Sequence, residues 1–416
     1  MSKKKKLKSV LTLLDIGTSK ICCMVVRFGQ DGVPEVIGFG YERASGIQAG
    51  AIIDMDAATD CIQKTIKQAD TQADWRTTNV VVNVSSTQMR AHHIHKEIEI
   101  SDGRPINAGD VRRLVDGVIA GCLAEGDEVV HAFPLSYIVD KEQNIQDPRG
   151  LYGTRLGVHM HVITLPESQT RNLVAVLDRC HITIDTKVAT PYASALAVVN
   201  EEEKDVGVSV VDFGAGTTSI AIFLDGGLVH LDLIPQGGNV ITKDIARGLN
   251  TYFSSAERLK TLHGATFSST RDGIERLIVP VLGEEGVNIQ VPQAELISIV
   301  IPRVEEILEN VGRIFDRYPY FVVSTQHLVL TGGGSMLQGI KEKTEILLGG
   351  TVRMGKPEII RGLPTQYESY TFSTCIGLLK YVMIREKSLL NAKFKTQPTP
   401  KKGFIGKVMQ WLVQNF

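Results

Sequence analysis

The sequence predicts an α/β fold in which two similar halves face a common cleft. Three glycine-rich turns lie far apart in the chain, at residues 13–20, 210–218 and 328–335, and each follows an apolar run. Apolar runs that end in glycine are typical of buried strands followed by tight turns. One such turn alone is an ordinary strand–turn. Three in this order, at roughly even spacing, indicate two related halves that supply turns to one site.

The residue types in these turns suit phosphate groups and a divalent cation. In the first two turns an acid ends the strand, Asp15 and Asp212, and glycine and threonine follow. Glycine lets backbone N–H groups approach phosphate oxygens. Two carboxylates that face each other across a cleft suit a Mg²⁺ ion that keeps most of its waters. Side-chain donors for phosphate follow the acids: Thr18, Lys20, Thr217 and Thr218.

The three turns resemble the phosphate-1, phosphate-2 and adenosine motifs of the actin-like ATPases, the superfamily of actin, heat-shock chaperones and sugar kinases. The resemblance implies an actin-like, ribonuclease-H-like fold with duplicated domains around a nucleotide cleft that takes ATP and Mg²⁺. Asp15 and Asp212 would hold the metal through water. The nucleotide-binding residues that it implies are Asp15, Gly17, Thr18, Ser19, Lys20, Asp212, Gly214, Gly216, Thr217, Thr218, Gly238, Glu257, Lys260, Gly332, Gly333, Gly334 and Ser335.

Glu257 and Lys260 are three residues apart, so they share one face of a helix. In relatives of this kind an E-x-x-K pair lies against the adenosine end of the nucleotide. An exposed ion pair, which contributes a few tenths of a kcal/mol, is the alternative.

The composition excludes several classes of protein. A chain of 416 residues is long enough for two or more domains, and its net charge of −1 gives no overall field that favours nucleic acid. None of the six cysteines forms a C-x-x-C pair, so we expect core thiols in a reducing cytosol rather than a zinc or redox motif. No stretch approaches the roughly 20 apolar residues of a membrane span. The basic start, with lysine at 3–6, precedes an apolar run too short for a signal peptide.

Hydrophobic patterns predict the elements in chain order. Strands are expected within 11–28, 33–40, 80–84, 92–100, 131–139, 158–164 and 182–188, and Gly226–Gly227 marks a hairpin in the second half. Helices are expected at 57–69, 106–123 (opened by Asn107), 166–179, 191–197, 240–249, around 255–260, at 292–315 and at 370–383. The helix at 191–197 has small side chains, which suit tight packing of two domains at a hinge and equally suit a plain core helix.

The strands and helix between 86 and 166 interrupt the first half, later than the inserted lobe of actin. An insertion at this point resembles FtsA, a family of bacterial cell-division proteins, and differs from actin-like and MreB-like filaments. The resemblance implies subdomain 1A at 8–85, 167–197 and 365–388, an inserted subdomain 1C (an SHS2 domain) at 86–166, subdomain 2A at 198–239 and 305–364, and subdomain 2B at 240–304.

The end of the chain predicts a linker and an amphipathic helix. Residues 389–402 are polar and contain two prolines, as a flexible linker does. At about 100° per residue, residues 403–416 form one broad apolar face: Phe404, Ile405, Val408, Met409, Trp411, Leu412 and Phe416. With flanking lysines, this helix suits the interface of an anionic membrane, and docking on the protein's own core is the alternative. FtsA has its membrane anchor here, which implies a peripheral protein on the cytoplasmic side of the bacterial cell membrane at the division septum.

The resemblance also implies partners. The tubulin-like protein FtsZ would dock its C-terminal peptide near Arg303 and Glu306, although a solvated helix face is equally compatible with these residues. Self-association into filaments, and contact of subdomain 1C with later division proteins, are further expectations. The expected function is to polymerise on the membrane and to tether FtsZ filaments to it.

The sequence does not show whether bound ATP is hydrolysed. Asp212 is the one candidate catalytic residue, because it could order a water for attack on the γ-phosphate or only organise magnesium. We expect an ATP-binding protein with at most weak ATPase activity. The alternative function is a sugar or acetate kinase, which would need a catalytic acid beside a second-substrate pocket. A chaperone ATPase would need a substrate-binding domain after the last helix.

Overall fold

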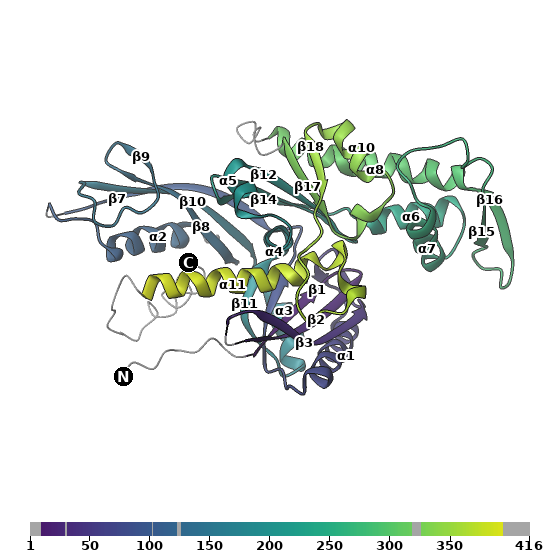
Figure 1. The fold of residues 1–416 in the computed structure, drawn as a ribbon, viewed down its shortest axis with the longest axis horizontal. Coiled ribbons are helices and arrows are strands. Elements are labelled where there is room, and N and C mark those ends of the chain that lie inside the picture. Colours follow the sequence, from purple (N-terminus) through teal and green to yellow (C-terminus); the bar gives the residue numbers. More distant parts are fainter. Residues whose placement is uncertain (1–9, 30, 102, 123–125, 318–325, 394–416) are drawn as a thin grey trace.

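The structure is a computed structural model that describes residues 10–29, 31–101, 103–122, 126–317 and 326–393 (Figure 1). Its first sheet contains β1 (Val10–Ile16), β2 (Lys20–Phe28), β3 (Pro34–Arg43), β6 (Asn79–Val84) and β11 (Thr183–Ala189). Its second contains β12 (Val208–Phe213), β13 (Thr218–Leu224), β14 (Gly227–Ile234), β17 (His327–Thr331) and β18 (Thr351–Met354).

These two sheets have the same topology. The first has the order β11-β6-β1-β2-β3 and the second the order β18-β17-β12-β13-β14. In each, three consecutive strands form an antiparallel meander, and two later strands pair in parallel beside the first of them. The predicted duplicated α/β architecture is therefore confirmed.

In the first half, the helix α1 (Met55–Ala73) covers the meander. Asp54 caps it, because its Oδ1 accepts from the N–H groups of Asp56 and Ala57 at 3.0 Å. Gly40 of β3 permits the close approach, since a Cβ there would lie 1.9 Å from the carbonyl oxygen of Thr65. The remaining elements of this half are β4 (Ile47–Gln48), β5 (Ala51–Ile52) and α3 (Glu167–Arg179).

The inserted segment forms a separate sheet with its own core, at the left of Figure 1. It contains β7 (Arg90–Glu99), α2 (Ala108–Cys122), β8 (Asp127–Val139), β9 (Glu142–Ile145) and β10 (Arg155–Pro166), with the strand order β7-β10-β8-β9. Asn107 opens α2 as predicted, because its Oδ1 accepts from the Gly109 N–H at 2.7 Å. The sequence patterns missed β9, which is short and mostly exposed.

Three helices of the second half lie close to the predicted ranges: α6 (Gly238–Gly248), α7 (Phe253–His263) and α8 (Gln293–Asp316). This half also contains the helices α5 (Glu201–Val206) and α10 (Ile340–Leu348), and a hairpin of β15 (Arg276–Pro280) and β16 (Asn288–Pro292). The helix α8 contains Pro302 and still continues, because Val300, Val304 and Ile307 are buried on both sides of it. The helices α5 and α10 and the hairpin of β15 and β16 were not predicted.

Two helices cross at the centre of the molecule, α4 (Thr190–Leu196) and α11 (Ser373–Lys393) (Figure 1). A Cβ at Gly377 would lie 1.6 Å from the carbonyl oxygen of Ala193, so the crossing requires glycine. The small residues predicted at 191–197 therefore do pack tightly against a second helix. Three short 3-10 turns complete the described elements: η2 (Gly333–Met336), η3 (Thr365–Tyr367) and η4 (Tyr370–Phe372).

The helix α11 differs from the prediction at both of its ends. Residues 370–372 form η4 rather than the start of the expected helix, and α11 runs to Lys393, into the predicted linker 389–402. The predicted membrane helix 403–416 lies outside the described residues. Within the described residues, no helix combines the length and the apolar character that crossing a membrane requires.

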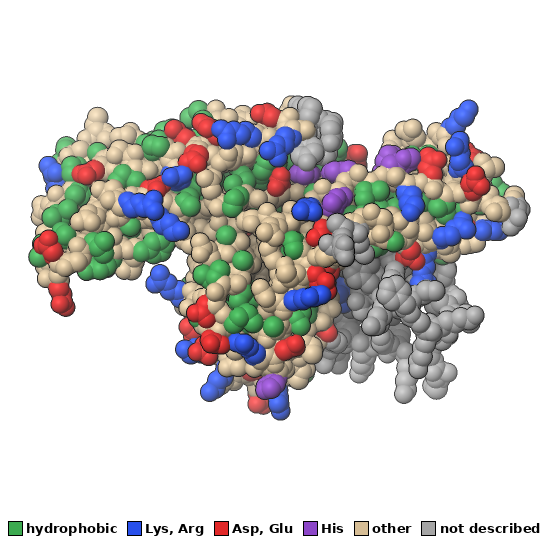
Figure 2. Space-filling model, turned by 180° about the vertical axis from the view of Figure 1, so that it is seen from behind, with side chains coloured by type: hydrophobic (Ala, Val, Ile, Leu, Met, Phe, Trp, Pro, Cys, Tyr) green, Lys and Arg blue, Asp and Glu red, His purple; other side chains and the backbone are tan. Residues whose placement is uncertain are grey.

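The surface charge is mixed. On the face shown in Figure 2, Lys and Arg side chains alternate with Asp and Glu side chains, in keeping with the net charge of −1. All six cysteines are free, and all but the half-buried Cys180 are buried, as expected for core thiols.

Candidate nucleotide-binding site

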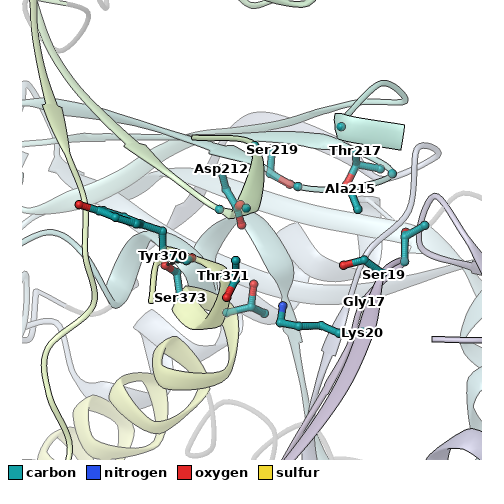
Figure 3. A pocket seen from close by; sticks show the side chains of 18 of the residues that line it. Gly17, Ser19, Lys20, Asp212, Ala215, Thr217, Ser219, Tyr370, Thr371 and Ser373 are labelled. Carbon is teal, nitrogen blue, oxygen red and sulfur yellow. Dashed lines mark hydrogen bonds between the residues drawn. The ribbon is translucent and has the colours of Figure 1, made fainter. Parts of the chain in front are cut away.

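A cavity of about 350 Å³ lies where the three glycine-rich turns meet (Figure 3). The first two turns are closed in the same way: the Gly17 N–H donates to the Lys20 carbonyl, and the Gly214 N–H to the Thr217 carbonyl, both at 3.0 Å. They come from different halves and touch, since a Cβ at Gly216 would lie 2.5 Å from Thr18 Oγ1. The two halves thus present matching turns to one space.

The two predicted acids are buried at this cavity. Asp15 is 2% exposed, and its Oδ2 has no hydrogen-bond partner among the described residues, although Lys20 Nζ lies 3.7 Å away. Burial raises the pKa of Asp15, against the lowering effect of Lys20. Burial also raises the pKa of Asp212 to about 6, against the Ser194 hydroxyl and Lys20. Both carboxylates therefore need further positive charge or hydrogen-bond donors.

Lys20 is the cation nearest to these acids. Figure 3 shows its side chain reaching from the first turn into the space below Asp212. Burial lowers the pKa of its ammonium, but the surrounding groups together, with Asp15 the largest contributor, outweigh this effect and the pKa is raised. Lys20 is therefore charged at neutral pH.

The third turn, at residues 328–335, packs closely against Asp212. Gly332 has φ +84°, and a Cβ there would lie 2.2 Å from Asp212 Oδ1. A Cβ at Gly334 would lie 2.6 Å from the Phe213 ring. Glycine is needed at both positions because the turn packs directly on the end of β12.

Glu257 and Lys260 also line the cavity. Lys260 Nζ donates to Glu257 Oε2 at 2.7 Å, to Thr242 Oγ1 at 2.8 Å and to the Gly238 carbonyl at 3.0 Å. Burial lowers the pKa of the Lys260 ammonium, against the effect of Glu257. The pair is partly buried, with side chains 13% exposed for Lys260 and 41% exposed for Glu257, and it ties α7 to the start of α6.

Most of the residues predicted to bind nucleotide line this cavity, and two do not. Thr218 donates through Oγ1 to the Gln236 carbonyl at 2.8 Å, and Ser335 donates through Oγ to the Gly332 carbonyl at 2.7 Å. Both residues are buried, and their hydroxyls are used in these contacts within the protein. The predicted residues that line the cavity are Asp15, Gly17, Thr18, Ser19, Lys20, Asp212, Gly214, Gly216, Thr217, Gly238, Glu257, Lys260, Gly332, Gly333 and Gly334.

Sequence reasoning missed several lining residues. Asn83 lies on β6, where its Oδ1 accepts from the Ile16 N–H at 2.7 Å and fixes the strand that ends in the first turn. Ser85 follows the same strand, and a polar residue after an apolar run was the available signal. The segment that starts α11 also contributes Tyr370, Thr371, Ser373 and Thr374. No local pattern marks it, because only the fold brings it to the cleft.

Arg303 and Glu306 lie away from the cavity, on α8. Arg303 Nη1 donates to Glu306, and Arg303 Nε donates to Asp244 Oδ2 of α6 at 2.5 Å. The hydrogen bond to Asp244 is the main reason that the pKa of Arg303 is raised. Among the described residues, no group of three or more His, Cys, Asp or Glu side chains is arranged to hold a metal ion.

Two matched sheets with matched turns over one cleft define an actin-like protein. Solved structures agree on the fold. The PilM–PilN type IV pilus biogenesis complex is similar with a TM-score of 0.64 and 16% identity, covering 88% of this chain and 97% of that chain. MreB5 of Spiroplasma citri bound to ADP has a TM-score of 0.57 and 13% identity, covering 92% and 99%.

The sequence comparisons give the family. The family described as "Cell division protein FtsA" matches residues 209–377, and "SHS2 domain inserted in FTSA" matches 86–164. The chain is 32% identical to the FtsA of Agrobacterium fabrum, over 99% of this chain and 96% of that protein. It is 30% identical to the FtsA of Escherichia coli strain K12, over 97% of each. The chain belongs to the FtsA family of cell division proteins, which sets aside the sugar kinases and chaperones considered from the sequence.

Proposed function

We propose that this protein binds ATP together with Mg²⁺ in the cleft between its two halves. The observation that carries the proposal is that two matched turns and two buried carboxylates, Asp15 and Asp212, meet at one cavity. Solved structures of MreB5, which shares the fold, are described as bound to ADP and to AMPPNP. These neighbours support an adenine nucleotide as the ligand.

The site residues fit a hydrated magnesium ion. Within the part of the chain that the structure describes, the buried Asp15 Oδ2 has no hydrogen-bond partner, and burial raises the pKa of both acids. Water molecules around a divalent cation would supply donors to these oxygens, with phosphate oxygens completing the shell. Magnesium supplies positive charge that neutralises the phosphate groups.

The chain's own residues would orient the nucleotide. Backbone N–H groups of the turns at 17–20 and 214–217 would donate to phosphate oxygens, and the Lys20 ammonium would pair with them. Glu257 and Lys260 would bound the adenosine end, next to the third turn. Asp212 would order the attacking water, and we propose at most weak ATPase activity, since phosphoryl transfer depends mainly on positioning and electrostatics.

Replacing Gly333 with valine should weaken ATP binding at least tenfold. Gly333 lines the cavity, and a Cβ there would already lie 3.3 Å from Thr371 Cγ2, so the larger side chain would occupy the place of the nucleotide. Titration with a fluorescent ATP analogue in the presence of Mg²⁺ measures the effect. Gly273→Val is the control, because a Cβ there has no neighbour closer than 3.9 Å. Equal affinities of the two variants would place the nucleotide elsewhere.

We further propose that the protein polymerises on the cytoplasmic membrane and tethers FtsZ filaments to it at the division site. Membership of the FtsA family and the predicted amphipathic helix at 403–416 support this role. Contact with later division proteins is assigned to the inserted subdomain, which has its own core. The FtsZ C-terminal peptide is assigned to α8, near Arg303 and Glu306.

Arg303→Met should weaken binding of an FtsZ C-terminal peptide by up to about a hundredfold if the contact is desolvated. The neutral substitution is preferable to charge reversal, because a carboxylate at 303 would face Asp244 and Glu306. Fluorescence anisotropy with the full chain measures the affinity. Arg313→Met is the matched control: it lies on the same helix and its side chain is 67% exposed. Unchanged binding by Arg303→Met would remove this residue from the site, and no binding by the wild type would contradict the partner.

A further inference from the structure

Gln236 lies between the nucleotide cavity and the surface of α8. Its carbonyl accepts from Thr218 Oγ1 at 2.8 Å. The next two residues rest on the second turn: the Gly238 N–H donates to the Gly214 carbonyl at 2.9 Å, and a Cβ at Gly237 would lie 2.6 Å from the same oxygen. Because these contacts are so close, a displacement of the turn at 214–217 would also displace the backbone of Gln236.

The side chain of Gln236 extends toward α8. Its Nε2 donates to Glu306 Oε1 at 2.9 Å, and its Oε1 accepts from Asn310 Nδ2 at 2.8 Å. Both ends of the amide are thus held by α8. Glu306 in turn accepts from Arg303. A continuous chain of hydrogen bonds therefore joins the second turn to Arg303.

A second connection between the same two places runs along α6. This helix begins at Gly238, which lines the cavity, and its Asp244 accepts from Arg303 Nε. A short helix moves as a rigid element, so a displacement at Gly238 also reaches Asp244. Arg303 therefore donates to two carboxylates. Asp244 is part of α6 and moves with it, and Glu306 is hydrogen-bonded to Gln236.

The helix α8 contains a proline, Pro302, directly before Arg303. Pro302 lacks an N–H group, so the helix misses one backbone hydrogen bond there. The side-chain hydrogen bonds to α8 lie at and after this point: Asp244 accepts from Arg303, and Gln236 bonds Glu306 and Asn310, about one and two turns further along. They can therefore set the position of Arg303 and Glu306.

We propose that Gln236 couples nucleotide occupancy of the cleft to partner affinity at Arg303 and Glu306. The inference rests on the proposed function, which places the FtsZ peptide on this face of α8. Phosphates bound by the turn at 214–217 hold Gly237 and Gly238 in one position, and Gln236 then holds Glu306 and, through it, Arg303 in the arrangement that receives the peptide. Nucleotide raises peptide affinity, and the peptide raises nucleotide affinity by the same factor, because coupling between two sites is reciprocal.

The test measures the affinity of the full chain for a fluorescent FtsZ C-terminal peptide, with and without saturating Mg²⁺ and AMPPNP. In the wild type we expect nucleotide to tighten binding at least about fivefold. In Gln236→Ala, nucleotide should change the peptide affinity by less than about twofold. Gln293→Ala is the matched control and should keep the wild-type factor. Its amide also makes a hydrogen bond from α8, to the His263 carbonyl at 3.0 Å, but has no link to Gln236.

Gln236→Glu guards against a folding defect in the alanine variant, with thermal melting as the check on both. It keeps the length of the side chain, places a carboxylate against Glu306, and should also lose the coupling. If the peptide binds and either folded variant retains the wild-type factor, the inference is wrong. A wild type that binds the peptide equally with and without nucleotide would also overturn it. A wild type that binds no peptide at all would instead contradict the proposed partner, and the inference with it.

Discussion

Asp212→Asn is expected to stabilise the nucleotide-free protein and to abolish its response to Mg²⁺ and ATP. Burial raises the pKa of Asp212 from its ordinary value of 3.8 to about 6. A carboxyl group whose pKa is raised by folding contributes stability that is complete below the unfolded pKa and is lost as pH rises through the folded pKa. At pH 7 the ionised group therefore costs the folded state up to about 3 kcal/mol, an order-of-magnitude figure from roughly two pKa units at about 1.4 kcal/mol each.

Asparagine has the same shape and no charge, so this cost disappears. The melting temperature of the variant should exceed that of the wild type at pH 7.5, and the difference should shrink as the pH falls below about 6. The thermal shift given by ATP with Mg²⁺ should be lost, because a neutral amide no longer organises the metal. Stability gained at the expense of a strained functional group is a common trade-off.

Asp60→Asn is the matched control for the Asp212 experiment. Asp60 is exposed on α1, so the same change of side chain should leave the free energy of unfolding within about 0.5 kcal/mol and keep the response to nucleotide. An Asp212→Asn variant that melts below the wild type would show that the buried charge is not a cost. A variant with the full nucleotide shift would show that Asp212 does not organise the metal.

The sequence was informative wherever chemistry and local pattern coincide. Asp15 and Asp212 each end an apolar run and precede a glycine, and this local signal predicted both the strand ends and the two acids of the cavity. Asn107 predicted the start of α2 because a side-chain cap acts within three residues. The duplication of the fold followed from recognising that the first two turns are alike.

What the sequence could not predict depends on contacts between distant segments. Asn83 and Ser373 reach the cavity only after β6 has paired with β1 and α11 has crossed α4. Thr218 and Ser335 have the residue types of phosphate ligands, but the fold points the Thr218 hydroxyl at the Gln236 carbonyl and the Ser335 hydroxyl at the Gly332 carbonyl of its own turn. The contacts of Gln236 could not be predicted either, because its partners Glu306 and Asn310 lie about seventy residues further along the chain.

Deleting residues 403–416 should release the protein from liposomes and leave ATP binding intact. The apolar face of the predicted helix includes Phe404, Trp411, Leu412 and Phe416. Burying it in the membrane interface should contribute several kcal/mol at roughly 25 cal/mol per Å². Each of Lys401, Lys402 and Lys407 should add about 1 kcal/mol on anionic lipid. Flotation of the full chain with anionic vesicles, at low and high salt, separates the two contributions, because salt weakens only the electrostatic one.

Trp411→Glu tests the same helix with a single change, since a charge at the edge of the apolar face should also release the protein. Gln414→Glu is the matched control: it introduces the same carboxylate on the opposite, polar face, and should float nearly as well as the wild type. Release by both variants would mean that added negative charge, rather than loss of the apolar face, weakens binding to anionic lipid. If the truncated chain still floats, membrane contact lies elsewhere, and the helix is a terminal element that packs on the protein itself. A membrane anchor requires the apolar face that these two substitutions distinguish from the polar one, whereas the length and composition of the helix alone also fit a docked helix.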